Sequence, residues 1–110
     1  MKKIAILLAL ASILSALPAR GVQTEPLFGI AADAEKKTLS IVVKSSGCTG
    51  KGDFSFAMKG DVLTFKRIRR DDCKAMPQRH TIIYSVEELG IDSREPFRLG
   101  NPISYSERLF

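Results

Sequence analysis

The sequence predicts an all-β domain, a small antiparallel sandwich or half-open barrel with a single short helical turn. Short stretches in which apolar and polar residues alternate predict the strands, because successive side chains of a strand point to opposite faces. Glycine-containing turn sequences separate these stretches. The chain also has two cysteines, which is typical of a small exported domain stapled by a disulfide.

Residues 1–21 have the three parts of a secretory signal peptide, which are a basic start, an apolar middle and small residues at the exit. The apolar middle, residues 4–17, has 14 residues, whereas a transmembrane helix needs about 20. This difference argues against an uncleaved membrane anchor, the alternative interpretation. We expect cleavage after Ala19 or Gly21, a periplasmic or secreted product, and no stable membrane insertion after cleavage.

Residues 22–110 are enough for a single small domain. The whole chain has a net charge of +5, and removing residues 1–21 leaves 14 Lys and Arg against 12 Asp and Glu, a net charge of +2. Because this charge is small, general attraction to nucleic acid or to an anionic membrane is weak, and any important basic character must be local. The phenylalanines are predicted to face the core, which leaves no platform for base stacking, so we predict no nucleic-acid partner.

Four central stretches have the two-residue period of a strand, and their apolar faces can pack in one core. These faces are Leu39, Ile41 and Val43 in residues 38–45; Phe54, Phe56 and Met58 in 53–58; Leu63 and Phe65 in 62–69; and Ile82, Tyr84 and Val86 in 80–86. Residues 27–31 predict an additional strand that turns back through 33–37, although 31–37 fits a short helix equally well. Residues 103–106 predict a last edge strand.

Turn and capping residues mark the connections between these stretches. Gly60 predicts a tight hairpin, and residues 51–53 repeat the same KGD sequence as a second turn. Ser85 and Glu88 have the spacing of a helix capping box, and Gly90 predicts the end of that helix. The space between them allows one helical turn.

The order of the strands brings both cysteines to one end of the domain. If the four strands form an antiparallel meander, the loops 46–52 and 70–79 lie at the same end, and these loops contain Cys48 and Cys73. We therefore predict a Cys48–Cys73 disulfide, with two free buried thiols as the alternative. Such a bond closes a loop of about 25 residues and is worth about 3 kcal/mol in the chain-entropy model.

The stretch SSGCTGKGDF, residues 45–54, does not match a phosphate-binding P-loop. Gly50 and Lys51 are followed by Gly52, where the motif has Ser or Thr. The next residues also predict a strand, whereas a P-loop precedes a helix whose N-terminus faces the phosphate. We interpret the stretch as a turn held by its cysteine.

No set of residues predicts catalysis or metal binding, so we expect neither an enzyme nor a cofactor. His80 is the only histidine, and no G-x-S-x-G sequence or free cysteine supplies a nucleophile for it. Asp71 and Asp72 are adjacent and point apart, whereas the carboxylates of an acid–base pair share a cleft. Met76 and His80 lie close in sequence, but without a spaced His/Cys cluster they predict no metal site.

The strongest local charge feature is KRIRRDDCK, residues 66–74. We predict a basic surface at the disulfide end that contacts a protein or an anionic ligand, and its residues are Lys51, Arg69, Arg70, Lys74 and Arg79. The leading hypothesis is therefore an exported, non-enzymatic binding module of unknown ligand. The alternative explanation of these charges is a solvated edge strand that resists aggregation and is partly neutralised by Asp71 and Asp72.

Two other functions fit the same sequence. Residues 73–80 form a loop that the disulfide ties at one end, and a braced loop can present Lys74 to a trypsin-like protease as a substrate mimic. A plain connecting loop stiffened by Pro77 is the simpler explanation of this segment. The other alternative is a structural envelope protein without a specific ligand.

Several segments together resemble a group of small exported bacterial domains that contain a disulfide and have no assigned activity. The pattern of the group is S-G-C-T-x-K-x-D-F, then a strand with arginine before D-x-C-K/R, then S-x-E-E-L-G. The matching segments are SGCTGKGDF, LTFKRIRRDDCKA, IIYSVEELGI and FRLGNP, within residues 45–102. The resemblance implies a stapled β domain and export, and it implies no catalytic residue.

Overall fold

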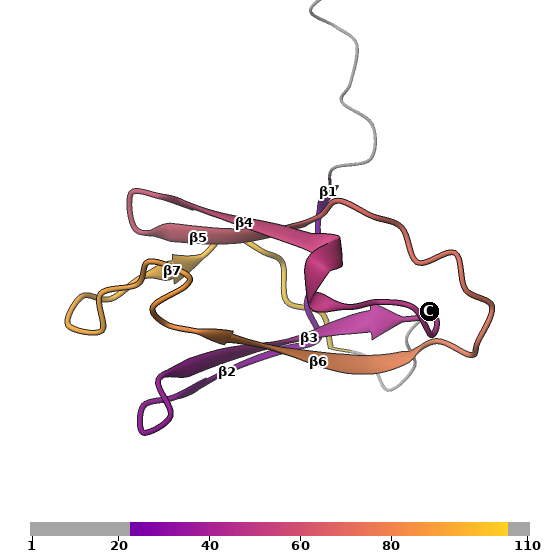
Figure 1. The fold of residues 1–110 in the computed structure, drawn as a ribbon. Coiled ribbons are helices and arrows are strands. Elements are labelled where there is room, and N and C mark those ends of the chain that lie inside the picture. The colour runs from indigo at the N-terminus through magenta and orange to yellow at the C-terminus, as the bar shows by residue number, and fades with distance from the viewer. Residues whose placement is uncertain (1–22, 106–110) are drawn as a thin grey trace, which may run out of the picture.

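The computed structural model describes residues 23–105, which fold into two facing β-sheets (Figure 1). The predicted leader, residues 1–21, lies outside the described residues. Most strand pairs are antiparallel, so the predicted all-β antiparallel fold class is confirmed, and the two separate sheets make it the sandwich of the two predicted forms rather than the half-open barrel. Among the described residues, none forms a helix that is long and apolar enough to cross a membrane.

Strand β5 (Val62–Arg67) is the centre of the first sheet. Strand β4 (Phe54–Lys59) pairs antiparallel with all of β5 through a tight hairpin, in which Gly60 has a φ of 60°. On the other side of β5, strand β1 (Gln23–Thr24) pairs antiparallel with its end and strand β7 (Arg98–Leu99) pairs parallel with its start. The hairpin predicted at Gly60 is therefore confirmed.

Strand β3 (Thr38–Ser45) is the centre of the second sheet and lies between β2 (Gly29–Asp33) and β6 (Gln78–Ser85). Both neighbours run antiparallel to it. A turn over residues 34–37 joins β2 to β3, and the Asp33 carboxylate accepts hydrogen bonds of 3.0 Å from two backbone N–H groups of this turn. The additional strand therefore exists, although it covers Gly29–Asp33 rather than the predicted 27–31. The alternative helix over 31–37 is wrong because the Asp33 side chain closes a turn instead.

The chain crosses from the second sheet to the first between β3 and β4. Residues 38–45 and 53–58 belong to different sheets, so the four strands form two facing sheets rather than a meander within one sheet. The link ends in a 3-10 turn, η1 (Lys51–Asp53), in which the Asp53 N–H donates to the Gly50 carbonyl at 3.1 Å and the Gly50 N–H donates to the Asp53 carboxylate at 2.8 Å. The crossing still reverses the chain, so both cysteine loops remain at one end.

The helical turn predicted after β6 is a set of hydrogen-bonded turns rather than a helix. The capping box forms, since the Glu88 N–H donates to the Ser85 hydroxyl at 3.0 Å and the Ser85 N–H donates to the Glu88 carboxylate at 2.8 Å. Gly90 follows with a φ of 70° and reverses the chain. Residues 86–90 are too few for successive helical hydrogen bonds. The helical segment of the described residues is η1 instead.

The core lies between the sheets and contains the predicted apolar faces of β3, β5 and β6. Its buried members are Leu27, Leu39, Ile41, Val43, Phe54, Leu63, Phe65, Ile82, Tyr84 and Leu89. Phe56 remains 38% exposed because β4 is an edge strand, although its ring contacts that of Tyr84 with 5.8 Å between ring centres. Leu89 lies outside the predicted strands, and Leu27 begins the predicted strand 27–31 without being assigned to a core face, so the sequence pattern did not indicate their burial. Truncating one of these leucines to alanine costs about 2–5 kcal/mol.

One side of the sandwich is closed by a seam between the two ends of the described chain. Leu27 forms a parallel bridge with Ile103, and its N–H donates to the Pro102 carbonyl at 2.9 Å. The Leu27 carbonyl accepts a hydrogen bond of 2.8 Å from the Ser104 N–H. Within residues 103–105, the described part of the predicted last strand, Ile103 alone forms a β-bridge.

The Asn101 side chain completes this seam inside the molecule. Its amide group is buried, donates to the carbonyls of Glu25 and Phe65 at 2.7 Å, and accepts from the Phe65 N–H at 2.8 Å. These bonds replace the strand pairing that β5 lacks at this point. The outer edges of β4 and β6 have no strand partner among the described residues, so the sandwich is closed on one side only.

Candidate functional site

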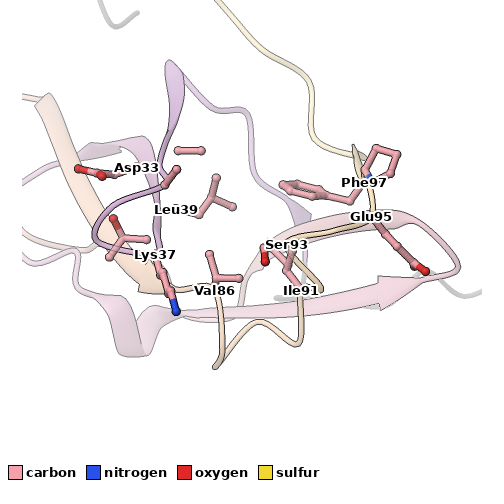
Figure 2. Close-up of a pocket in the computed structure, with 12 residues that line it drawn as sticks. Asp33, Lys37, Leu39, Val86, Ile91, Ser93, Glu95 and Phe97 are labelled. Carbon is pink, nitrogen blue, oxygen red and sulfur yellow. The ribbon is translucent and has the colours of Figure 1, made fainter.

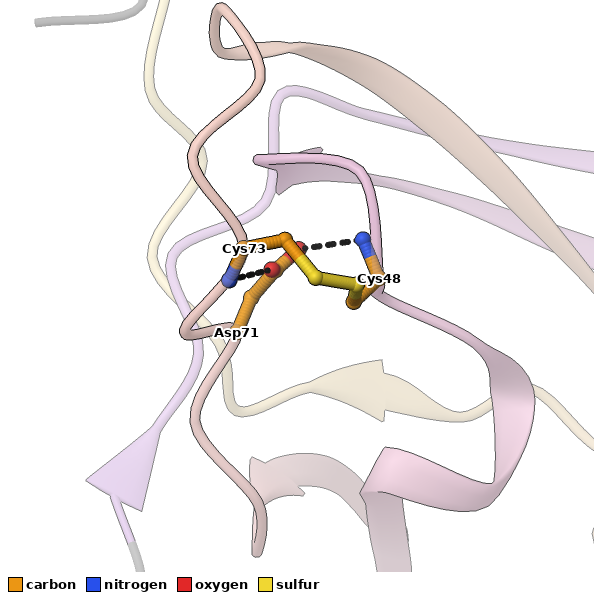
Figure 3. A group of neighbouring side chains, drawn as sticks. All are labelled: Cys48, Asp71 and Cys73. Atoms are coloured by element: carbon orange, nitrogen blue, oxygen red, sulfur yellow. Dashed lines mark hydrogen bonds between the residues drawn. A yellow bond between two sulfur atoms is a disulfide. The ribbon is translucent and has the colours of Figure 1, made fainter.

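The loops 46–53 and 68–77 form one end of the sandwich, which we call the disulfide pole. Cys48 and Cys73 are joined by a disulfide with 5.7 Å between their Cα atoms, which confirms the predicted pairing (Figure 3). One loop follows a strand of the second sheet and the other follows a strand of the first. The disulfide therefore ties the two sheets together at this pole.

Next to the disulfide, the Asp71 carboxylate accepts hydrogen bonds from both loops. Its Oδ2 accepts from the N–H groups of Ser46 at 2.8 Å and Cys48 at 3.1 Å. The same oxygen accepts from the Thr49 hydroxyl at 2.6 Å, and Oδ1 accepts from the Cys73 N–H at 3.1 Å. These bonds favour the ionised form, and the Thr49 hydroxyl contributes most to holding the pKa of Asp71 well below its ordinary value of 3.8. Asp71 is thus a noncovalent brace beside the covalent one.

The same group of residues is not arranged to hold a metal ion. The ligand atoms of Cys48, Asp71 and Cys73 lie within 4.8 Å of one another. However, the two sulfurs are bonded to each other, whereas a metal is bound by thiolates. Both carboxylate oxygens also accept hydrogen bonds, Oδ2 from the opposite loop and Oδ1 from the Cys73 N–H of the same loop. The cluster is therefore a structural brace.

A largely buried ion pair continues this network towards the seam. The Arg67 Nε donates to the Glu25 carboxylate at 2.9 Å, and their side chains are only 16% and 11% exposed. Arg67 also donates to the Thr49 hydroxyl at 3.1 Å and to the Lys44 carbonyl at 2.9 Å. Because Thr49 donates to Asp71 and accepts from Arg67, the brace and the ion pair form one hydrogen-bonded network.

A cavity of about 420 Å³ opens beside this network and is called the basic cavity here. Its lining residues are Glu25, Pro26, Phe28, Lys44, Ser46, Arg67, Arg70 and Asp71. The two carboxylates are already paired, Glu25 with Arg67 and Asp71 with the loop donors. Four of the five N–H donors of Arg67 are used in these bonds, which leaves one donor of Nη1 without a partner among the described residues. The lining thus combines guanidinium groups with the apolar Pro26 and Phe28.

Two of the predicted basic residues gather at the basic cavity. Arg70 lines it, and Arg79 lies beside it with its guanidinium 5.9 Å from the centre of the Phe28 ring. Arg70 pairs with Asp72 at 3.6 Å, but both side chains are largely exposed, and such a surface pair is worth little. Arg79 stands directly opposite Lys44 in the β3–β6 ladder, which concentrates positive charge at this rim.

The other three predicted residues do not line this cavity. Arg69 pairs with Asp53 at 3.5 Å. The Lys51 ammonium pairs with the Glu88 carboxylate at 2.9 Å. Glu88 follows the last residue of β6, at the end of this strand that is far from the disulfide. Lys74 is exposed on the loop between β5 and β6. The structure therefore brings Arg70 and Arg79 to the basic cavity, whereas Lys51 belongs to the loop 46–53 but directs its side chain to Glu88 and away from this cavity.

Sequence reasoning missed Arg67 and Asp71 as residues that build the site. A signal for Arg67 existed, because it follows Leu63 and Phe65 at the two-residue period and so falls on the core face of β5. A charged residue on a core face needs a buried partner, which here is Glu25. No comparable signal separates Asp71 from the adjacent Asp72.

A second cavity, of about 610 Å³, lies at the opposite end of the sandwich, between the β2–β3 turn and residues 91–97 (Figure 2). Its apolar lining includes Leu39, Val86, Ile91 and Phe97. Val86 was predicted in the core and lines this cavity instead. The carboxylates of Asp33 and Glu95 point to opposite sides and away from the apolar side chains.

No protein-family model, curated protein sequence or solved structure matches the chain. The resemblance to small exported bacterial domains with a disulfide therefore stays a prediction. The arrangement of residues at the disulfide pole is what indicates a function.

Proposed function

We propose that the chain is an exported, non-enzymatic binding module that takes an anionic group of its ligand in the basic cavity. The observation that carries this proposal is the cavity of about 420 Å³ whose lining includes Arg67, Arg70 and Phe28. Guanidinium groups bind carboxylate, phosphate and sulfate through charge-assisted hydrogen bonds. The apolar wall suits a ligand that carries an apolar or aromatic part next to its anionic group.

The rigidity of the disulfide pole supports binding. The disulfide, the Asp71 brace and the Arg67–Glu25 pair hold the cavity walls before any ligand arrives. A site that is already ordered loses less conformational entropy on binding. The disulfide also agrees with work in an oxidising compartment, where such bonds persist.

The titratable groups with large pKa shifts have structural explanations, which supports a non-enzymatic role. The low pKa of Asp71 makes it a poor proton acceptor at neutral pH. Burial raises the pKa of Tyr84 to about 12, so this phenol stays protonated. Its hydroxyl has no hydrogen-bond partner among the described side chains and backbone.

The proposal is tested by titrating the protein with a heparin-derived sulfated oligosaccharide in a calorimeter at several salt concentrations. We expect binding that weakens with salt, because charge pairs are screened over about 10 Å at 0.1 M. We expect Arg70→Ala to weaken it about tenfold, since one charge-assisted contact is lost. Salt-independent binding, or none, would contradict the proposal and favour a structural protein without a specific ligand.

The matched control is Arg94→Ala. Arg94 is also an exposed arginine that pairs with an aspartate two residues away, Asp92, at 3.3 Å. It lies in the segment 91–97, at the opposite end of the sandwich. We expect its removal to leave the affinity unchanged. Equal weakening by both variants would show that only net charge matters and that the basic cavity is not the site.

A further inference from the structure

The loop that joins β5 to β6 swings outward at the disulfide pole before it returns to the sandwich (Figure 1). Lys74 and Met76 lie on this loop with exposed side chains, that of Met76 being 84% exposed. The described residues provide no ion pair or hydrogen bond to the Lys74 side chain. The Lys74 side chain therefore extends into solvent without a partner among the described residues.

The backbone is pinned on both sides of Lys74. On one side, Cys73 is bonded to Cys48 and its N–H donates to Asp71 at 3.1 Å. On the other side, the Ala75 N–H donates to the Ser46 carbonyl at 3.0 Å. The two anchors, Ser46 and Cys48, are themselves fixed by their N–H bonds to Asp71.

The residue between these anchors, Gly47, lies directly beneath the loop. A Cβ atom on Gly47 would stand 3.1 Å from the Cβ of Ala75 and 3.6 Å from the Cβ of Cys73. Gly47 also has a φ of 113°, which favours glycine. Close packing against Gly47 therefore supports the segment that carries Lys74.

We infer that residues 72–76 form a substrate-like loop for a serine endopeptidase whose specificity pocket ends in a carboxylate. Lys74 is the residue that enters this pocket, because a carboxylate at the base of the pocket selects lysine or arginine. A loop held in one conformation binds more tightly than a flexible substrate. This function uses the outward loop and goes beyond the basic cavity, which lies beside the Arg67 network.

The neighbouring basic residues lack this presentation. Arg79 belongs to β6, whose backbone is paired with β3 along its whole length and cannot enter a protease cleft. Arg69 is paired with Asp53 at 3.5 Å.

Arg70 is exposed and its neighbours Arg69 and Asp71 also contact the scaffold, but its guanidinium pairs with Asp72 at 3.6 Å. Of Arg69, Arg70 and Lys74, Lys74 alone combines scaffold contacts on both flanking residues with an exposed side chain that has no ion pair among the described residues.

The same contacts explain how a substrate-like loop can inhibit. The protease serine oxygen bonds to the Lys74 carbonyl carbon, the Lys74–Ala75 peptide bond breaks, and the serine proton passes through the protease histidine to the Ala75 nitrogen. Cys73 stays bonded to Cys48, and Ala75 stays tethered through the β6–β3 ladder. The new amine therefore remains beside the ester at a high effective concentration. Attack by this amine restores the peptide bond, returns the proton to the serine and competes with hydrolysis by water.

The test uses the purified oxidised protein, trypsin and a chromogenic trypsin substrate. We expect tight inhibition by the native protein, and a loss of about 100-fold in Lys74→Ala, because the acidic pocket is left without its partner. Lys74→Arg is expected to restore inhibition. Lys59→Ala is the control, because Lys59 is exposed at the β4–β5 hairpin and has no contact with the loop.

Mass spectrometry of the complex supplies a second measurement. Slow cleavage confined to the Lys74–Ala75 bond, with the cut form resealed on incubation with trypsin, supports the inference. Rapid digestion without inhibition, or inhibition that Lys74→Ala leaves intact, overturns it. Binding of the sulfated oligosaccharide is measured on the same variants, and Lys74→Ala is expected to leave it unchanged. Either proposal can therefore fail while the other stands.

Discussion

The Asp71 carboxylate accepts hydrogen bonds from both loops of the disulfide pole, whereas the neighbouring Asp72 is 79% exposed. We expect Asp71→Asn to lower the melting temperature at pH 7 by several degrees, because the amide replaces an acceptor oxygen with a donor that faces backbone N–H groups. Circular dichroism during heating measures this change. Asp72→Asn is the matched control, and an equal effect of both substitutions would rule out the brace.

The same residue makes the stability of the protein depend on pH. The pKa of Asp71 is lower in the folded chain than its ordinary value of 3.8, so the folded state binds fewer protons than the unfolded state. Its contribution is therefore complete above pH 3.8 and is lost as the pH falls towards the folded pKa. In Asp71→Asn this contribution is missing, and the melting temperatures of the variant and the native protein should converge in acid.

The residues of the site differ in how far sequence alone reveals them. Arg67 is visible from its position on the core face of an alternating strand, and this position requires a buried anion. Asp71 is not visible, because its neighbour Asp72 has the same chemistry and only the fold decides which carboxylate meets the opposite loop. Lys51 was grouped with the pole because of its place in the chain, yet a lysine side chain is long enough to reach Glu88 on another element.

Among the elements, β7 depends on a close approach to β5 that only glycine permits. A Cβ atom on Gly100 would overlap the Thr64 hydroxyl and stand 3.0 Å from the Val62 side chain. We expect Gly100→Ala to cost about 1–3 kcal/mol, the usual penalty of overpacking. It would also disturb the hydrogen bond of 2.8 Å from the Gly100 N–H to the Leu63 carbonyl.

Urea unfolding measures this cost. Gly52→Ala serves as the control, because a Cβ atom there meets nothing within 4 Å and η1 accepts the added methyl group. Adding Thr64→Ala to Gly100→Ala removes the overlapping hydroxyl and should recover part of the loss. If Gly100→Ala leaves the urea midpoint unchanged, Gly100 does not pack closely against Thr64 and Val62.

The strands themselves were largely predictable from side-chain period. Residues 38–45 alternate so regularly that the core face of β3, with Leu39, Ile41 and Val43, follows directly. The assignment of strands to sheets does not follow, because a local pattern gives the direction of a side chain but not the identity of the neighbouring strand. Phe56 illustrates the gap, since it has the core period and still lies at an exposed edge.

For the molecule as a whole, the disulfide is the one covalent cross-link, in addition to the backbone connections, between the two sheets. Its partners are separated by 25 residues, and removing the bond with Cys48→Ser and Cys73→Ser should cost about 3 kcal/mol in the chain-entropy model. The urea midpoint measures this loss, and the same shift is expected when the native protein is reduced. An unchanged midpoint after confirmed reduction would mean that the Asp71 brace alone fixes the pole.

This link was predictable although the sheet assignment was not. The prediction of Cys48 with Cys73 depends on the number of chain reversals between them, and this number is the same for a single meander and for two facing sheets. A prediction that depends only on the number of chain reversals is therefore correct even when the strands are assigned to the wrong sheets. The lining of the basic cavity cannot be predicted in this way, because it depends on which side chains of separate elements meet.

The seam at Leu27 also sets the order in which a newly made chain can finish folding. The Asn101 amide joins Glu25 across 76 positions of sequence, so nearly the whole domain must be present in the folding compartment before the Phe65 N–H obtains its partner. Until then the side of the sandwich that the seam closes remains open. Maturation is therefore completed late, after emergence of the last segment, and a truncated product lacking that segment should be recognised by quality-control proteases as incomplete.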